Sequence, residues 1–170
     1  MAKHNLGLIS VELGEIESDG ALSTSLAPVG ETVIGSATMT TADATVTDFN
    51  IEESDSPIES VVTAPGKVTF AWSTYNIEPA EMVRFFGGTL TAGDTENPGG
   101  TWAAPDTFIE NELSVVLTDK KGNVFQIPRA KLSSKMSISF SKSKLGQIDV
   151  TATVLQPELA GLARIKFLYV

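Results

Sequence analysis

The fold of this chain is decided by residues 108–156, which read FIENELSVVLTDKKGNVFQIPRAKLSSKMSISFSKSKLGQIDVTATVLQ. Side chains along a strand alternate between two faces, so an apolar residue at every second position indicates one dry face and one wet face. One such set is Met136, Ile138 and Phe140, opposed by Lys135, Ser137, Ser139 and Ser141. A second set is Ile148, Val150, Ala152 and Val154, opposed by Asp149, Thr151 and Thr153. We expect both apolar sets to face the core of a mainly β protein.

The same alternation predicts strands outside this stretch. These strands are expected around Ile9, Val11 and Leu13, and over residues 31–41, 44–51, 67–75 and 165–170. In the segment 67–75, Val68, Phe70 and Trp72 share one face. A short turn at Ala42-Asp43 is expected to join 31–41 to 44–51, and Asp119 to Asn123 read as a hairpin turn. Pro128 lies inside an otherwise good strand, which predicts an edge position or a bulge there.

One helix is predicted at about 79–86. Pro79 suits the first helical position, and Gly87-Gly88 can adopt the left-handed conformation that ends a helix. Pro79, Met82, Val83 and Phe86 form one apolar stripe at helical spacing, with Glu81 and Arg84 opposite. Two to three turns are marginal alone, so this helix must pack on a sheet.

The length of 170 residues predicts one domain covering residues 1–170. We expect two packed antiparallel β-sheets, as a sandwich or partly open barrel, with the short helix on one flank. Long loops are expected at about 14–30, 52–66 and 92–106, where Gly, Pro, Ser and acidic residues gather. Loops of this length are usually functional or flexible.

Charge and composition restrict the function. The net charge of −9 argues against a surface that grips DNA phosphates, although six lysines between Lys120 and Lys144 leave a local basic patch open. The absence of cysteine removes disulfides, thiol nucleophiles and cysteine-ligated zinc. No segment has the roughly 20 apolar residues of a membrane helix. Glu12 and Glu15 interrupt any apolar signal core, so we expect synthesis in the cytoplasm without a cleaved signal peptide.

Candidate catalytic and metal-binding residues are few. His4 is the one histidine, and it provides neither a catalytic triad nor a usual transition-metal site. The carboxylate pairs nearest in sequence are Glu52/Glu53, Glu78/Glu81 and Glu110/Glu112, and nothing in the sequence places any of them in a cleft. Asp94, Glu96 and Asn97 could hold calcium, but an ordinary turn fits their spacing better. We expect no enzyme, no cofactor and no small-molecule substrate.

Two tryptophans could stack on sugars. Trp72 lies on the apolar face of a predicted strand and is expected in the core. Trp102 lies between Gly100 and Pro105 in a predicted loop, where it could bind a ligand or cover an edge of the core. It motivates one alternative function, a non-catalytic β-sandwich module that binds carbohydrate or protein.

Two segments resemble a known family. KVTFAWSTYNIEPAEMVRFFGGTL (67–90) resembles the strand-then-helix element of bacteriophage major tail tube proteins. QIPRAKLSSKMSISFSKSKLGQIDVTATVLQP (126–157) resembles the late part of that family, where a strand with an Ile-Pro-X-Ala centre leads to a polar strand and then to a strand running into a proline. The resemblance covers roughly residues 67–91 and 108–157.

This resemblance implies a virion protein whose copies form six-membered rings. Such rings stack into the tail tube through which DNA passes without specific binding, and related folds build the inner tubes of contractile tails and of type VI secretion. The implied partners are further copies of the chain and other tail proteins, in a virion assembled in the host cytoplasm. Another tail component, such as a terminator or a decoration protein, remains an alternative.

An extended loop after the early strands makes the ring-to-ring contact in that family. Carried to this chain, the resemblance implies an assembly loop within residues 48–66. Its candidate residues are Ile51, Glu52, Glu53, Asp55, Ile58 and Glu59. A mobile acidic loop without a partner is the alternative for this segment.

Overall fold

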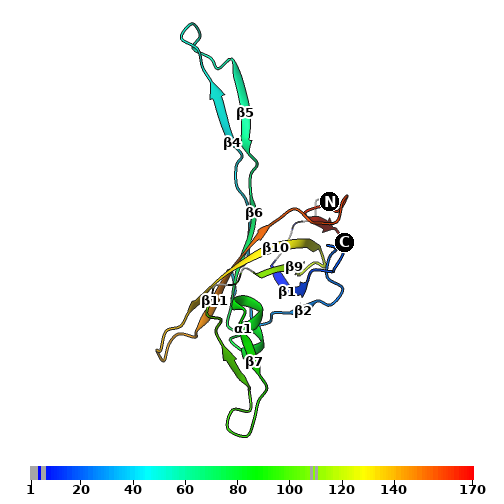
Figure 1. The fold of residues 1–170 in the computed structure, drawn as a ribbon, viewed down its shortest axis with the longest axis vertical. Helices are drawn as coiled ribbons and strands as arrows, with labels where there is room; N and C mark the ends of the chain where they lie inside the picture. The colour runs from blue at the N-terminus through cyan, green and yellow to red at the C-terminus, as the bar shows by residue number, and fades with distance from the viewer. Residues whose placement is uncertain (1–3, 5–6, 108, 110) are drawn as a thin grey trace.

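A computed structural model describes residues 4, 7–107, 109 and 111–170. The described chain is mainly antiparallel β with one short helix, which confirms the predicted fold class (Figure 1). The elements, in chain order, are β1 (Leu8–Glu15), β2 (Ala27–Pro28), β3 (Thr38–Thr41), β4 (Thr45–Phe49), β5 (Glu59–Ala64), β6 (Val68–Thr74), α1 (Pro79–Phe86), β7 (Thr89–Thr91), β8 (Thr101–Ala103), β9 (Asn111–Asp119), β10 (Val124–Ser137), β11 (Gln147–Val154) and β12 (Lys166–Leu168).

The layers that pack across the core belong to one curved sheet. Its strand order is β2-β1-β9-β10-β11-β6-β3, and β12 pairs with β10. The segment 27–33 links the two ends of this sheet, because Val29 N–H donates to Val11 O at 2.9 Å in β1 while Val33 N–H donates to Ser73 O at 2.8 Å in β6. The body is therefore a partly open barrel whose strand edges are largely paired.

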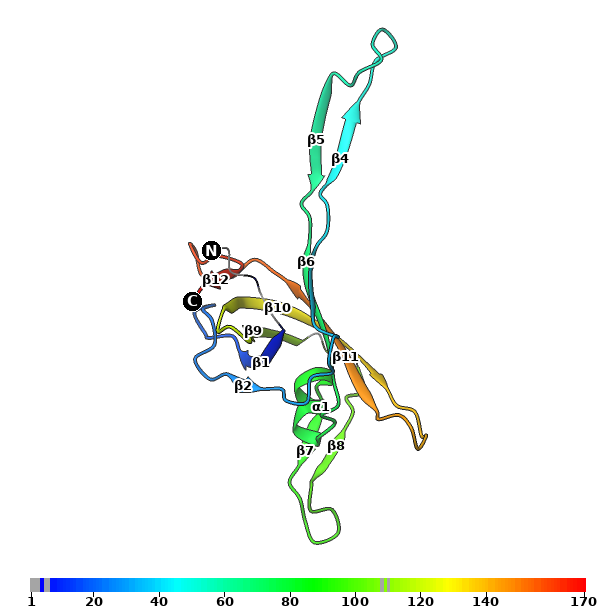
Figure 2. The ribbon, with the colours of Figure 1, turned by 180° about the vertical axis from the view of Figure 1, so that it is seen from behind.

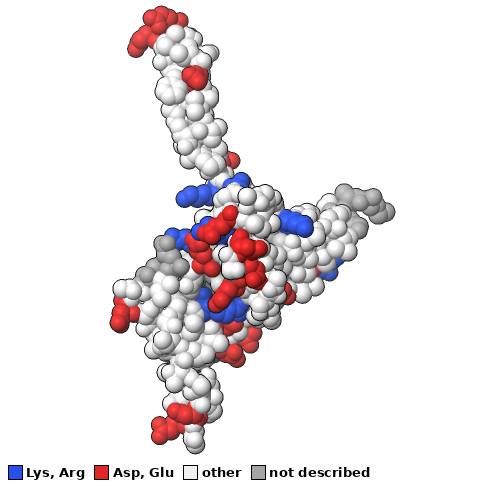
Figure 3. Space-filling view, turned by 45° about the vertical axis from the view of Figure 1, so that its right-hand side comes forward, with Lys and Arg blue, Asp and Glu red and all other residues white. Residues whose placement is uncertain are grey.

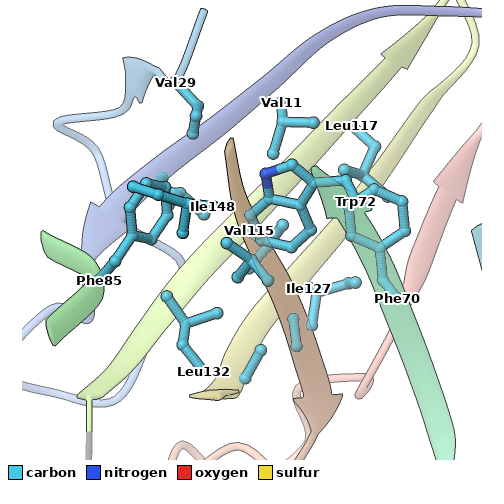
Figure 4. Close-up of a cluster of buried hydrophobic side chains, with 14 of the residues drawn as sticks. Val11, Val29, Phe70, Trp72, Phe85, Val115, Leu117, Ile127, Leu132 and Ile148 are labelled. Atoms are coloured by element: carbon cyan, nitrogen blue, oxygen red, sulfur yellow. The ribbon is translucent and has the colours of Figure 1, made fainter. Parts of the chain in front are cut away.

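The core fills the inside of this curved sheet. Val11 of β1, Trp72 of β6, Val115 of β9 and Ile127 of β10 point into the same space (Figure 4). Trp72 is 1% exposed and its ring stacks on Phe70 with centroids 4.9 Å apart. The predicted core positions of Trp72 and of the β11 set Ile148, Val150, Ala152 and Val154 are confirmed.

The first apolar set of the deciding stretch is placed differently. β10 ends at Ser137, and Met136, Ile138 and Phe140 are 36%, 44% and 100% exposed. The prediction that they face the core is wrong. Alternation shows which residues share a face, but it does not show where the opposing layer ends, and the hairpin between β10 and β11 extends beyond the core (Figure 2).

Helix α1 has the predicted bounds, with Pro79 in its first turn and Gly87 at its C-terminus with a φ of 71°. The buried stripe differs from the prediction, because Phe85 is fully buried in the core, Phe86 is only partly buried against it, and Glu81 is buried. Arg84 explains this difference. Its guanidinium donates to Glu81 Oε1 at 2.6 Å and to the carbonyl oxygens of Leu13 and Ala27 at 3.0 Å each, so polar groups fasten the helix to the sheet.

Strand partners also differ from the local expectation. Ala42-Asp43 is not a reversing turn, because β3 pairs with β6 while β4 pairs with β5. The chain continues outward from β3 into β4 and returns through β5 into β6 (Figure 1). The predicted loop 52–66 therefore contains β5, the loop 14–30 contains β2, and the loop 92–106 contains β8.

Two turn predictions agree with the structure. Asp119 N–H donates to Asn123 O at 3.0 Å in the hairpin turn between β9 and β10. At Pro128 the pairing of β9 with β10 shifts register between Ile127 and Ala130, which is a bulge. The alternative of an edge position is excluded, because β10 lies between β9 and β11.

Candidate functional site: an exposed β-arm

The hairpin of β4 and β5, residues 45–64, forms an arm that stands away from the body (Figures 1 and 2). Every residue of both strands is exposed. β4 and β5 contact each other extensively and have no comparable contact with any other described helix or strand. A two-stranded hairpin alone is at best marginally stable in water, so packing on another surface would stabilise this arm.

Apolar side chains lie on both faces of the arm. The register pairs Val46 with Val62 on one face, and it places Phe49 and Val61 diagonally on the other. Val46, Phe49, Val61 and Val62 are 50%, 51%, 40% and 59% exposed. Monomeric proteins seldom leave such groups gathered in one exposed element, and partner-binding surfaces commonly do.

The tip of the arm is acidic. Glu52, Glu53, Asp55 and Glu59 lie there, residues 45–64 contain no Lys or Arg, and the tip is red in Figure 3. Two backbone hydrogen bonds shape the tip: Ser54 N–H donates to Ile51 O at 3.3 Å, and Ile58 N–H donates to Phe49 O at 2.9 Å.

The structure thus brings together the six residues predicted for the assembly loop, with Glu59 as the first residue of β5. Ile51 and Ile58 among them are 42% and 63% exposed.

Sequence reasoning missed the apolar residues of the arm. The sequence pattern predicts a strand for Val46 and Phe49 without indicating which face of the strand they occupy, and it predicts a loop for Val61 and Val62. The signal that could have found them is the pair of β-branched runs at 45–47 and 61–63 around the turn residues 54–57, which is typical of a hairpin.

The other sequence candidates do not form a site. His4 and Glu78 are exposed, Glu81 is paired with Arg84, and Glu110 lies outside the described residues. Glu112 accepts a hydrogen bond from Arg129 Nε at 2.7 Å, and this bond raises the pKa of Arg129. Glu112 lines a surface hollow of about 530 Å³ together with Glu15, but the arginine already holds its carboxylate.

The loop of Asp94, Glu96 and Asn97 is an ordinary turn. Asp94 Oδ1 accepts the backbone N–H groups of Glu96 at 2.9 Å and Asn97 at 2.7 Å. Within the described ranges no group of three or more His, Cys, Asp or Glu side chains could hold a metal ion.

Trp102 covers an edge of the core. Its Nε1–H donates to Gly87 O at 2.8 Å, and its ring lies 6.1 Å from that of Phe86 between centroids. Both the polar atom and part of the ring are thus engaged within the chain. The residue that motivated a carbohydrate-binding module therefore has a structural role.

One further carboxylate is fixed locally, at the start of the loop after β1. Glu17 Oε1 accepts the Thr24 hydroxyl at 2.6 Å and the Thr24 backbone N–H at 2.8 Å. These hydrogen bonds to the ionised form lower the pKa of Glu17.

No protein-family model matches the chain, and no curated protein sequence matches it at a significant level. In the described part of the chain, no helix is long and apolar enough to cross a membrane.

Proposed function

We propose that this protein is a structural subunit of a bacteriophage tail tube, in which copies of the chain form stacked rings around a passage for DNA. The observation that carries the proposal is the arm, a long hairpin with apolar side chains on both faces and no extensive contact with the other described helices and strands. Such an element is stable when another chain covers it, and a neighbouring copy is the partner that self-assembly supplies.

The resemblance of residues 67–90 and 126–157 to tail tube proteins supports the proposal, and so does the position of the arm. The arm follows the early strands and precedes α1, where that family has its ring-to-ring loop. A net charge of −9 suits the wall of a conduit, because like charge keeps a polyanion from adhering.

Negative-stain electron microscopy of the concentrated protein tests the proposal. We expect rings or tubes from the full chain. The matched control replaces residues 43–66 by Asn-Gly, since Ala42 N–H donates to Lys67 O at 2.8 Å and a two-residue turn fits between them. This armless chain should fold and should not stack. A strictly monomeric full chain at all concentrations and salt conditions would refute the proposal.

The same experiment separates the other tail components. A tube subunit builds extended tubes of many copies from one chain, so the number of copies in each particle distinguishes it from a terminator or a decoration protein. Tubes that grow with protein concentration favour the tube subunit.

A further inference from the structure

The hairpin that joins β10 to β11 has the chemical features of the arm with the opposite charge. We call residues 135–147 the basic hairpin, because they include Lys135, Lys142 and Lys144 and no Asp or Glu. Phe140 and Leu145 beside these lysines are 100% and 71% exposed. Ser141 bridges to Lys144, so a tight turn places Lys142 at the tip. Within the described residues none of these three lysines forms an ion pair.

The two hairpins cannot meet within one chain. The arm leaves the body at one end of the long axis, and the basic hairpin projects on the other side of the body in both ribbon views (Figures 1 and 2). Their complementary charges and exposed apolar groups can be used between two copies. A contact between different surfaces of identical chains closes into a ring when its rotation closes, and otherwise repeats in one direction and builds an open stack.

A third projection gives an internal comparison. The hairpin of β7 and β8, residues 89–103, also points away from the arm (Figure 1). It carries Asp94 and Glu96 and no Lys or Arg, and its end is red in Figure 3. An acidic arm tip would be repelled there. Of the two hairpins on that side of the body, charge therefore favours the basic hairpin.

We infer that the acidic arm of one copy docks on the basic hairpin of a second copy, with Glu52 and Glu53 near Lys142 and Lys144 and with the exposed apolar groups of both hairpins covered together. This inference rests on the proposed self-assembly and adds the surface that receives the arm. It also requires that the contact weakens as salt screens the charges.

Site-directed cross-linking of the full chain tests the contact directly. Because the chain has no cysteine, Ser54→Cys in the arm and Ser143→Cys in the basic hairpin introduce single reactive positions. Mixing the two variants, one with a size tag, and adding a short bismaleimide should give the mixed dimer. The matched control is Thr95→Cys at the end of the β7–β8 hairpin, which should give at least about tenfold less mixed dimer with the Ser54→Cys chain.

Charge reversal tests the pairing of residues. Lys142→Glu with Lys144→Glu in the Ser143→Cys chain should lower the yield about tenfold. Glu52→Lys with Glu53→Lys in the Ser54→Cys chain should restore it. Lys120→Glu with Lys121→Glu changes the net charge equally on an exposed turn of the body and should leave the yield unchanged.

The inference is overturned by any of three outcomes: no mixed dimer above background, equal yields with Ser143→Cys and Thr95→Cys, or no rescue by the second charge reversal. Failure of the proposed function is a separate result. A specific mixed dimer without rings or tubes in the microscope would support the contact and refute the tube function. Tubes formed by chains with both lysines reversed would support the tube function and refute the contact.

Discussion

Removing the apolar groups from one face of the arm should weaken association and leave the monomer intact. Phe49 and Val61 lie diagonally on that face and are 51% and 40% exposed, so about half of each side chain remains to be buried. Full burial of such a side chain is worth roughly 1.5–3 kcal/mol, which leaves about 0.7–1.5 kcal/mol for each on assembly. Phe49→Ser with Val61→Ser should therefore weaken each contact roughly 10- to 150-fold.

The unfolding of the monomer should hardly change, because neither residue belongs to the core cluster. A surface substitution of this kind usually alters the free energy of unfolding by no more than about 0.5 kcal/mol. The two quantities are measured by sedimentation velocity over a concentration series and by urea denaturation of the dilute protein.

Ile34→Ser is the matched control. Ile34 is 100% exposed on the segment before β3, outside the arm and the other hairpins. We expect no change in association from this substitution. Association of the Phe49→Ser, Val61→Ser chain at wild-type concentrations would refute the reasoning that the arm is a contact surface.

Three further predictions concern the body. Trp72→Ala empties the centre of the core and should lower the free energy of unfolding by about 3–5 kcal/mol in urea denaturation. Arg84→Met leaves the Glu81 carboxylate buried without its partner and should lower the free energy of unfolding by about 3–5 kcal/mol. Adding Glu81→Gln should recover part of this loss. No recovery would contradict the ion pair as the cause of the loss. Thr24→Val should destabilise the protein more at neutral pH than in acid. Because its pKa is lowered, the ionised Glu17 carboxylate stabilises the folded protein at pH values above the ordinary pKa. This stabilisation is lost as the pH falls through the lowered pKa. If urea denaturation shows an equal effect of Thr24→Val at both pH values, the Glu17 carboxylate is excluded as the cause of the destabilisation.

The elements that local chemistry determines could be predicted from the sequence. The bounds of α1 follow from Pro79, whose ring fixes φ at a value that suits the first turn, and from Gly87, which can adopt the positive φ that ends the helix. The buried face of β11 follows from strict alternation, because that strand lies between two others over the core. The bulge follows from Pro128, which cannot donate to the ladder.

The remaining features depend on distant parts of the chain. Ala42-Asp43 has the composition of a turn, yet β3 pairs with a strand that begins at Val68. The exposure of Phe140 depends on where the opposing layer of the barrel ends, and the burial of Glu81 depends on an arginine that reaches β1 and β2. For the arm, the sequence indicated an acidic segment within residues 48–66, but the projection of this segment follows from its lack of packing against the other described helices and strands.

The connection between arm and body determines how the protein would respond to pulling. β5 leads into β6 through residues 65–67, and β6 lies between β3 and β11 in the sheet. Tension on the tip therefore runs along β6, at right angles to its hydrogen bonds, and strains the whole ladder in shear instead of opening it bond by bond. Bending would concentrate at the joint, where backbone pairing stops after Ala42 and Lys67 and resumes between Thr45 and Ala64. A filament tied together by such arms would resist stretching while it flexes at each subunit.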